Sequence, residues 1–319
     1  MMNRAKEGPK CIIRFQGFPP VEYDFTASTD VSLHLQAIAS RFGITADECN
    51  RYTLMGDGFQ YITPDVLASG FDVGKGVDVV LLPEYEAASS LRVLKDGDLS
   101  EKKKTIFSLG KTQLRNPAFS SQYIQQGGIS ALFQLCSETT GATLAFALTC
   151  LEACLGAREE EDGGEETVLL DEMVMLVDFV DNGNLNVSKS ALKCLVQLLQ
   201  GSKANTYTLI QQAIDASATK KGKDPYSLFL QSLEAQDIDI CVTTLRFLNT
   251  LLMKAETQTQ RARLLQILQQ LGGNFALQKL SVVGSEEILK GNNVSLSLGS
   301  FLIQLIMMMA TENGYLFSF

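Results

Sequence analysis

The stretch SQYIQQGGISALFQL, residues 121–135, places two adjacent glycines between two segments of helical apolar spacing. Each glycine in the middle of a helix would cost about 1 kcal/mol relative to alanine. The pair therefore predicts that a short helix ends there and that a longer one begins at a sharp joint. The same pattern recurs near the end of the chain as LGGNFALQKL, residues 271–280.

Similar apolar segments follow one another through the rest of the chain, each preceded by another helical pattern and a polar loop. They begin 44, 53 and 54 residues apart: ALTCLEACL (147–155), ALKCLVQLL (191–199), TLRFLNTLL (244–252) and LGSFLIQLI (298–306). Armadillo and HEAT repeats have periods of about 40–47 residues, so the later units need insertions, for which 158–166 and 218–225 are the obvious loops. Residues 87–319 are thus predicted to form an all-α armadillo/HEAT-like superhelix with a long groove.

The first 86 residues carry a different pattern. CIIRFQ (11–16) and VEYDFT (21–26) flank a GFPP turn (17–20), and the second of them alternates apolar and polar residues, as a strand with one buried face does. A helix capped by Asp30 follows, then a predicted hairpin from RYTLM to FQYIT (59–63) and an apolar strand, GVDVVLLP (76–83). The order β-β-α-β-β-β predicts a small α+β ubiquitin-like domain over residues 1–86, and hence a mixed fold class.

The composition narrows the classes of function. A net charge of −9 and a pI near 4.8 argue against a nucleic-acid partner, which usually meets a basic face. The 7 cysteines lie mostly at apolar helical positions, which indicates a reducing, cytoplasmic compartment. The polar N-terminus has no signal-peptide core, and the most apolar run, 296–310, is too short to span a bilayer.

No catalytic or metal constellation stands out, so we predict no enzyme activity, no metal and no cofactor. His34 is the only histidine, and its pattern places it mid-helix on an exposed face. Cys150 and Cys154 share one helix face, but no second pair with ligand spacing accompanies them, so core packing is the preferred interpretation. A site assembled from carboxylates in the groove is the enzymatic alternative, and nothing in the sequence points to it.

The chain resembles the N-terminal half of the ELMO family, the engulfment and cell-motility scaffolds. FQYIT (59–63) is similar to a hairpin strand of that family and VGKGVDVVLL (73–82) to the strand that follows. FSSQYIQQGGISAL (119–132) and SLFLQSLEAQDIDICVTTLRFLNTLLMKA (227–255) are similar to two of its helical units. The acidic insertion 158–166 and the segment SATKKGKDP depart from the family pattern.

This resemblance implies a non-enzymatic cytoplasmic scaffold that its partners recruit to the plasma membrane. The first domain would bind an active Rho- or Arf-type small GTPase. The armadillo groove would bind the cytoplasmic tail of a membrane receptor or the protein's own C-terminal half. That C-terminal half, absent from this sequence, would bind a DOCK-type exchange factor upstream of Rac and actin. The alternative is the N-terminal region of a formin, which pairs a GTPase-binding module with armadillo repeats ahead of an actin-nucleating domain.

Candidate contact residues follow from helix and strand faces, with no motif residue carried over. For the GTPase we predict the wet face of the second strand and the following helix: Glu22, Asp24, Thr26, His34 and Arg41. For the groove we predict polar residues of the repeated third helices, namely Lys193, Gln197, Arg246 and Asn249. For Asn249 the alternative is that it only satisfies a neighbouring backbone carbonyl.

Overall fold

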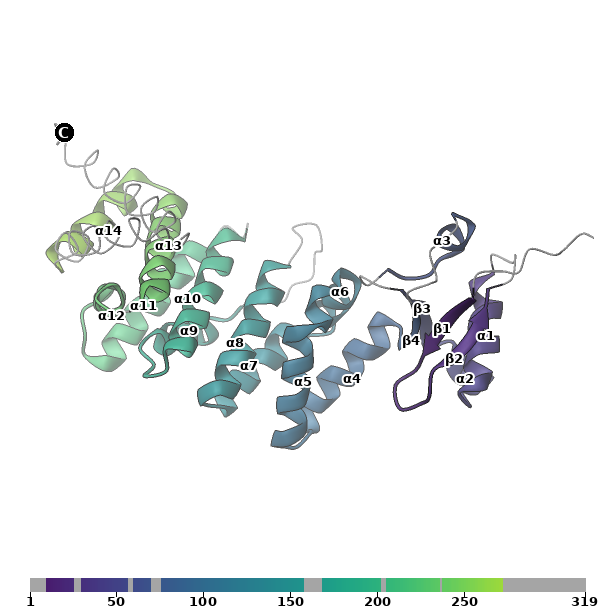
Figure 1. Ribbon diagram of the computed structural model, residues 1–319. Helices are drawn as coiled ribbons and strands as arrows, with labels where there is room; N and C mark the ends of the chain where they lie inside the picture. The colour runs from purple at the N-terminus through teal and green to yellow at the C-terminus, as the bar shows by residue number, and fades with distance from the viewer. Residues whose placement is uncertain are drawn as a thin grey trace, which may run out of the picture. The chain divides into compact units, whose positions relative to one another are not determined.

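The chain divides into two compact units, Met1–Arg92 and Val93–Phe319. The computed structural model describes residues 10–25, 30–56, 60–69, 76–157, 168–201, 205–235 and 237–271 (Figure 1). The domain boundary predicted after residue 86 falls inside helix α4 (Pro83–Asp96). Among the described helices, none is long and apolar enough to cross a membrane.

The first unit is built on a small mixed sheet of four strands in the order β2-β1-β4-β3. β1 pairs antiparallel with β2 and parallel with β4, and β3 pairs antiparallel with β4. The strands are β1 (Lys10–Arg14), β2 (Val21–Asp24), β3 (Tyr52–Met55) and β4 (Val77–Leu81). Because β1 and β4 run parallel in the middle, β2 and β3 form the two edges of the sheet.

Helix α1 (Val31–Arg41) packs its apolar side on one face of this sheet, as the sequence predicts. The Asp30 side chain caps it by accepting hydrogen bonds from the backbone N–H groups of Ser32 and Leu33. The shared core joins residues from both elements: Cys11, Ile13, Phe25, Ile38, Phe42, Leu54, Ile62, Val77 and Val79. The short helices α2 (Ala46–Cys49) and α3 (Pro64–Ala68) connect the later strands.

The predicted hairpin to 59–63 is formed only in part. An antiparallel bridge joins Met55 to Tyr61, flanked by backbone hydrogen bonds from Gly56 N–H to Gln60 and from Ile62 N–H to Leu54, but helix α3 already starts at Pro64. The Thr63 hydroxyl caps α3 and proline occupies its first turn, so the chain leaves the extended conformation early. The expected β-β-α-β-β-β order therefore becomes four strands with α1 across them.

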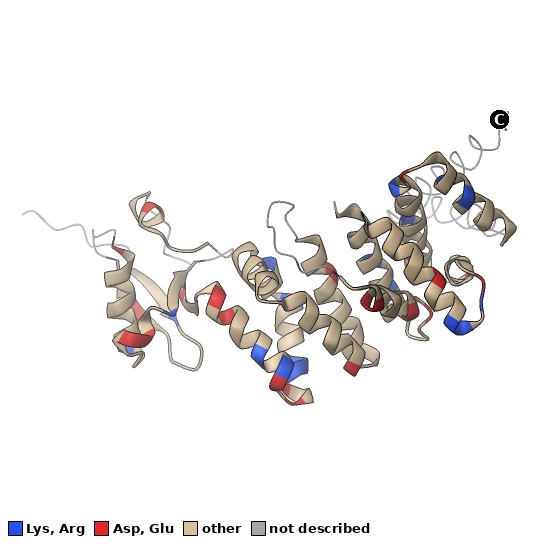
Figure 2. Cartoon of the chain, turned by 180° about the vertical axis from the view of Figure 1, so that it is seen from behind, with Lys and Arg blue, Asp and Glu red and all other residues tan. Residues whose placement is uncertain are grey.

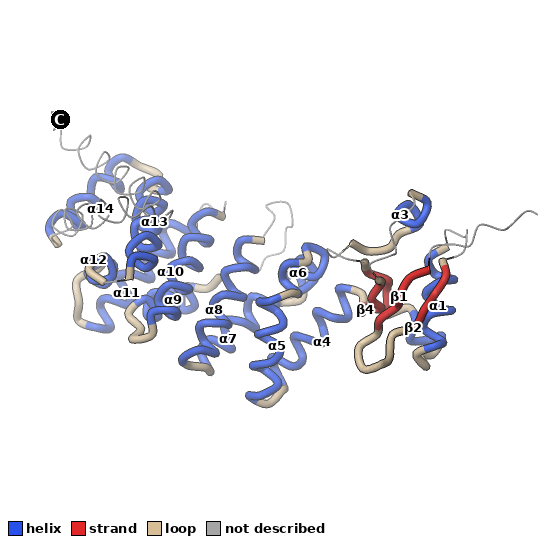
Figure 3. Tube along the Cα trace, in the orientation of Figure 1, coloured by secondary structure: helices blue, strands red, loops and turns tan. Residues whose placement is uncertain are grey.

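The second unit is a mostly helical, armadillo-like repeat array, shown as a succession of helices in Figure 3. Four helices pack in succession, α5 on α8, α8 on α10 and α10 on α13, and we call them the long-helix layer. The remaining helices pack beside this layer, for example α7 on α8, α9 on α10 and α12 on α13. The bounds are α5 (Leu99–Lys111), α6 (Pro117–Gln125), α7 (Gly128–Glu138), α8 (Gly141–Gly156), α9 (Leu170–Val180), α10 (Leu185–Gln200), α11 (Thr206–Lys221), α12 (Ser227–Leu233), α13 (Ile238–Lys254) and α14 (Gln258–Gln270), with a 3₁₀ turn at Gln113–Arg115.

The predicted repeats coincide with this layer. The segments 147–155, 191–199 and 244–252 lie in α8, α10 and α13, whereas 298–306 lies outside the described residues. The apolar spacing of each segment buries one side of its helix against its neighbours, which forms the continuous core of a repeat array.

The Gly-Gly joint is confirmed between α6 and α7. Gly127 adopts the left-handed conformation with a φ of 90°, which a glycine accommodates without a Cβ penalty. Gly128 begins α7 directly against the ring of Tyr123, a side chain that is fully buried. The first glycine therefore supplies the turn and the second lets the two helices approach closely. The second Gly-Gly, at 272–273, lies outside the described residues.

Buried thiols recur at the contacts within the long-helix layer. The Cys150 thiol of α8 donates to the carbonyl of Ile106 in α5 at 3.5 Å, and Cys194 of α10 donates to Leu148 of α8 at 3.3 Å. Cys154 is also buried, so the interpretation of the Cys150–Cys154 pair as core is confirmed. All seven cysteines are buried thiols that form no disulfide.

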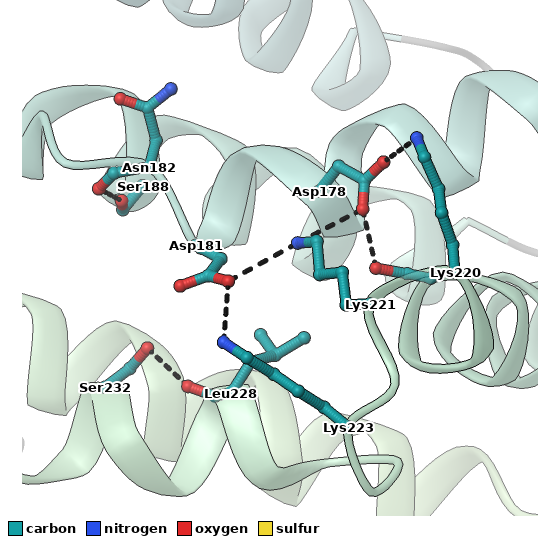
Figure 4. Close-up of polar contacts among 10 residues, drawn as sticks. Asp178, Asp181, Asn182, Ser188, Lys220, Lys221, Lys223, Leu228 and Ser232 are labelled. Carbon is teal, nitrogen blue, oxygen red and sulfur yellow. Dashed lines mark hydrogen bonds and ion pairs between the residues drawn. The ribbon is translucent and has the colours of Figure 1, made fainter.

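A cluster of ion pairs joins α9 to the end of α11 (Figure 4). Asp178 accepts hydrogen bonds from Ser217 at 2.6 Å and Lys220 at 3.0 Å and pairs with Lys221 at 3.2 Å. Asp181 pairs with Lys221 at 3.5 Å and Lys223 at 3.0 Å. We call this cluster the α9–α11 clamp.

The α9–α11 clamp corrects one prediction. The predicted loop 218–225 is wrong for its first part, because α11 continues to Lys221 and ends at Gly222, whose φ is 61°. The lysines of this segment act as helix-end charges held by two aspartates.

Candidate protein-binding surfaces

The predicted GTPase surface begins at strand β2, an edge of the sheet. In the described residues β2 pairs only with β1, so the polar backbone groups of its other side point outward. Glu22 and Asp24 are exposed and alternate with the half-buried Val21 and Tyr23. The two carboxylates therefore lie on the wet side of an edge that is able to pair with another strand.

Arg41, from the last turn of α1, lies beside this strand. Its guanidinium donates to the Glu22 carbonyl at 2.9 Å and sits 5.3 Å from the centre of the Tyr23 ring. It stays exposed while it ties α1 to β2. The structure thus places Arg41 beside β2, the strand that carries Glu22 and Asp24.

His34 is not exposed, which corrects the prediction. Its side chain is 3% exposed, and its Nδ1 is hydrogen-bonded to the Tyr23 hydroxyl at 2.9 Å. The Phe25 ring also packs against it, with the ring centres 5.0 Å apart. Helical spacing alone could not show this, because the neighbours that cover His34 come from β2 and its end. Thr26 lies outside the described residues.

The long-helix layer brings three of the predicted groove residues together. Lys193 of α10 pairs with Glu152 of α8 at 3.7 Å, and Arg246 of α13 adds a favourable charge interaction with the same carboxylate. Gln197 of α10 lies next to Gly156 of α8. Three consecutive long helices therefore contribute polar side chains to one surface.

Glu152 is the residue of this surface that the sequence analysis missed. Burial raises the pKa of its carboxyl above the usual 4.5, and the cations Lys193 and Arg246 oppose the shift without cancelling it. It is the one charged residue of α8, a helix otherwise made of apolar, small and hydroxyl residues. That isolation is the signal by which it could have been found.

A second ion pair crosses the same layer, between Lys189 of α10 and Asp239 at the start of α13. Together with the Lys193–Glu152 pair, it joins α8 to α10 and α10 to α13. The Lys189–Asp239 pair is partly exposed and contributes little stability, whereas Glu152 is half-buried.

Asn249 does not belong to this surface, which corrects that prediction. Its side chain is 3% exposed, on the side of α13 that faces the core with Leu245 and Leu252. Arg246, three residues earlier and therefore on a neighbouring part of the helix surface, is exposed. The 3.6-residue period places both near each other along the axis, and only the packing of α13 decides which of them faces solvent.

The described residues offer no group of three or more His, Cys, Asp or Glu side chains arranged to hold a metal ion. The thiols are poor nucleophiles because burial raises their pKa, to about 11 for Cys11 and about 12 for Cys150. The arrangement is suited to binding proteins through a strand edge and a polar helical surface.

Comparison with known proteins identifies relatives among the formins. A family model described as the FHOD1/3 FH3 domain matches residues 141–274. Formin-G of Dictyostelium discoideum is 23% identical over 277 residues, covering 83% of this chain and 25% of its own length. Formin-C of the same organism is 25% identical over 270 residues, covering 80% of this chain and 22% of its own. The chain thus spans about a quarter of the length of these relatives.

Among solved structures, a designed armadillo repeat protein in complex with the peptide (KR)4 has a TM-score of 0.49 and 14% identity, covering 68% of this chain and 81% of its own.

The sequence relatives support the formin alternative and leave the ELMO resemblance without support. The reason lies in the motifs: a Gly-Gly joint and a helical period are demands of the repeat architecture, which both families share. The DOCK-type partner, which rested on ELMO alone, is not carried further.

Proposed function

We propose that this chain is the N-terminal regulatory region of a formin-type actin-organising protein, with no enzymatic role of its own. The observation that carries the proposal is the match of residues 141–274 to the FHOD1/3 FH3 domain, together with the two formin relatives. In this proposal the first unit is a ubiquitin-like module that binds an active small GTPase. The long-helix layer binds a protein segment. The chain works in the cytoplasm and reaches the plasma membrane through these partners.

The GTPase surface that we propose is the β2 edge with Glu22, Asp24 and Arg41. The position of β2 at the sheet edge supports it, since an edge strand offers backbone groups to a partner strand, here apart from the Glu22 carbonyl that accepts from Arg41. The charges set its selectivity: two carboxylates beside one guanidinium disfavour a GTPase whose switch regions are acidic. A Rho-type partner with basic or apolar residues at that point fits better.

Calorimetry of the whole chain with Rho- and Arf-family GTPases, each loaded with GTP or GDP, tests this docking. We expect binding of a GTP-loaded member, and a loss of at least tenfold in affinity for Asp24→Lys. Asp47→Lys, on the exposed side of α2, is the matched control and should bind normally. Equal binding of both nucleotide forms, or no binding across the panel, contradicts the docking proposal.

For the long-helix layer we propose a segment supplied by the protein's own C-terminal half or by the cytoplasmic tail of a receptor. Lys193 and Gln197 of α10 and Arg246 of α13 support it, because they lie on successive helices and share one surface with the half-buried Glu152 of α8. A segment laid across the helices would contact all of them at once.

The matched pair for this second interaction is Arg246→Glu and Arg263→Glu. Arg246 lies in the layer, and Arg263 is exposed on α14, outside it. We expect the first substitution to weaken binding of the protein's C-terminal half or of a receptor tail at least tenfold, and the second to leave binding unchanged. Equal effects, or none, would remove the layer as the binding surface.

A further inference from the structure

Two aromatic side chains lie exposed side by side at the α5–α8 end of the long-helix layer. Phe107 of α5 is 53% exposed and Phe146 of α8 is 49% exposed. Their rings meet edge to face, with 6.0 Å between centres and a 72° angle between planes. Since a lone exposed apolar residue is ordinary, the informative feature is the pair, held in a fixed orientation by two different helices. We call Phe107 and Phe146 the aromatic step.

Cations surround the aromatic step on α5. Lys111 places its ammonium 5.6 Å from the centre of the Phe107 ring, a cation–π distance. Lys103 precedes Phe107 by four residues, so Lys103, Phe107 and Lys111 form one stripe along the helix. Lys104 adjoins this stripe, one position further round the helix. Lys103 and Lys104 make no ion pair with any residue that the structure describes.

The acidic side chains near the aromatic step do not neutralise the lysines of this stripe. The neighbouring lysine, Lys102, is already paired with Glu138 of α7 at 3.1 Å. Glu101 is held at the start of α5, where its carboxylate accepts the Asp98 backbone N–H at 3.0 Å. In Figure 2, blue and red segments lie close together where α4 meets α5. The chain as a whole is acidic, with a net charge of −9, whereas this part of its surface carries lysines without ion pairs beside exposed aromatic rings.

The surface of α8 next to Phe146 carries no large protruding side chain. Its exposed positions carry small side chains: Ala142, Thr149, Ala153 and Gly156. A polypeptide backbone is thus able to approach α8 closely along the same line on which the aromatic step stands. On the far side of α8 the surface continues to Lys193 of α10.

We propose that the aromatic step and the lysines of α5 receive an acidic protein segment that carries a large apolar side chain, bound in trans from a partner protein. The apolar side chain packs on the Phe107–Phe146 pair, and the segment's carboxylates pair with Lys103, Lys104 and Lys111. This inference rests on the proposed binding of a protein segment by the long-helix layer, and it names the chemistry of that segment and the end of the layer where it is anchored.

The observations favour an acidic segment over an anionic membrane. Membrane-surface binding gains from several basic residues without nearby acids and from apolar side chains that protrude. Here the rings contact each other and are only half exposed, and Glu101 and Glu138 lie on or beside the same helix. A peptide can place its carboxylates next to the lysines and away from Glu101 and Glu138. A uniformly anionic lipid surface would be repelled by both of these acidic side chains.

The test is a selection from a random peptide library displayed on phage, with the whole chain as bait, followed by affinity measurements on the enriched peptides. We expect enrichment of Asp or Glu together with Phe, Tyr, Trp or Leu. For a synthetic enriched peptide, we expect Phe107→Ala and Lys111→Glu each to weaken binding at least tenfold. The affinity should also fall as salt rises. Enrichment of basic peptides, or of none, would overturn the proposal.

Matched controls separate this site from other exposed residues. Leu169→Ala removes a side chain that is 63% exposed ahead of α9, and Arg263→Glu reverses a charge on α14; both should bind the peptide normally. Circular dichroism shows whether Phe107→Ala is folded, and if it is not, Lys111→Glu alone decides. Binding of the chain to phosphatidylserine vesicles that depends on Phe107 and Lys111, without peptide binding, assigns the patch to a membrane and sinks the inference.

The outcomes also separate this inference from the proposed function. If Arg246→Glu abolishes segment binding while Phe107→Ala and Lys111→Glu do not, the layer binds its segment elsewhere and only the present inference fails. If the selected acidic peptide binds at the aromatic step while no GTPase binds the first unit, the inference stands and the formin-type function fails.

Discussion

Gly128→Ala is expected to strain the joint between α6 and α7 far more than Gly127→Ala. A Cβ at position 128 would lie 2.3 Å from two ring carbons of Tyr123 and 2.5 Å from the Tyr123 carbonyl oxygen. Those distances are well inside van der Waals contact, and the ring is fully buried, so it has no free space into which to move. A Cβ at position 127 would meet nothing within 4 Å.

The two costs have different origins. At Gly127 the cost is conformational, because an alanine in the left-handed region loses roughly 1–2 kcal/mol. Restricting the unfolded chain returns about 0.4–1 kcal/mol, which leaves a net loss of about 1 kcal/mol. At Gly128 the cost is steric, and overpacking a buried site typically costs about 1–3 kcal/mol, occasionally more. Because one of the clashing atoms belongs to the backbone, we expect a loss of about 3 kcal/mol for Gly128→Ala.

Urea unfolding, followed by circular dichroism with linear extrapolation, measures both variants against the parent chain. Tyr123→Leu combined with Gly128→Ala adds a test of the cause. Leucine has no ring, so in that background Gly128→Ala should cost less, but the clash with the carbonyl of residue 123 should keep the cost above zero. Equal losses for the two glycine variants, or an unchanged cost in the Tyr123→Leu background, would refute the steric explanation.

Three further outcomes are expected. Asn249→Ala should lower the free energy of unfolding by about 1–3 kcal/mol, because the side chain is a buried polar group, whereas Arg246→Glu should change it by less than about 0.5 kcal/mol. Comparable losses for the two variants in urea unfolding would contradict the assignment of Asn249 to the core and Arg246 to the surface. Burial by itself would raise the pKa of Asp178, but hydrogen bonds from Ser217, Lys220 and Lys221 lower it from 3.8. The α9–α11 clamp therefore stabilises the fold above about pH 4, and this contribution is lost as the pH falls. Asp178→Asn should reduce the loss of unfolding free energy at acid pH by about 1 kcal/mol, and an unchanged pH dependence would contradict this explanation. Burial raises the pKa of the Cys150 thiol to about 12, so the cysteines should react with Ellman's reagent at pH 8 only after urea unfolding, and fast labelling of the native chain would show that this core opens readily.

The sequence by itself determined the first two strands, the helix that follows them and the repeated long helices. The Gly-Gly joint, the period of the repeated segments and the alternation in Val21–Asp24 each follow from local rules: glycine permits a left-handed turn, and the apolar spacing of a helix or strand marks the side that must be buried. These rules act over a few residues and need no knowledge of distant neighbours. The cap at Asp30 is of the same kind.

Only the tertiary structure decided which polar residues face a partner. His34 and Asn249 occupy helical positions that spacing leaves ambiguous, and both are buried in the folded chain, His34 beneath Tyr23 and Phe25 of another element. Glu152 gained its place because α10 and α13 bring Lys193 and Arg246 to it, and the aromatic step exists because α5 packs beside α8. The physical reason is common to all of these: helical period fixes a side chain's angle around its own axis, whereas burial and charge at a surface depend on what the next helix in the stack places opposite.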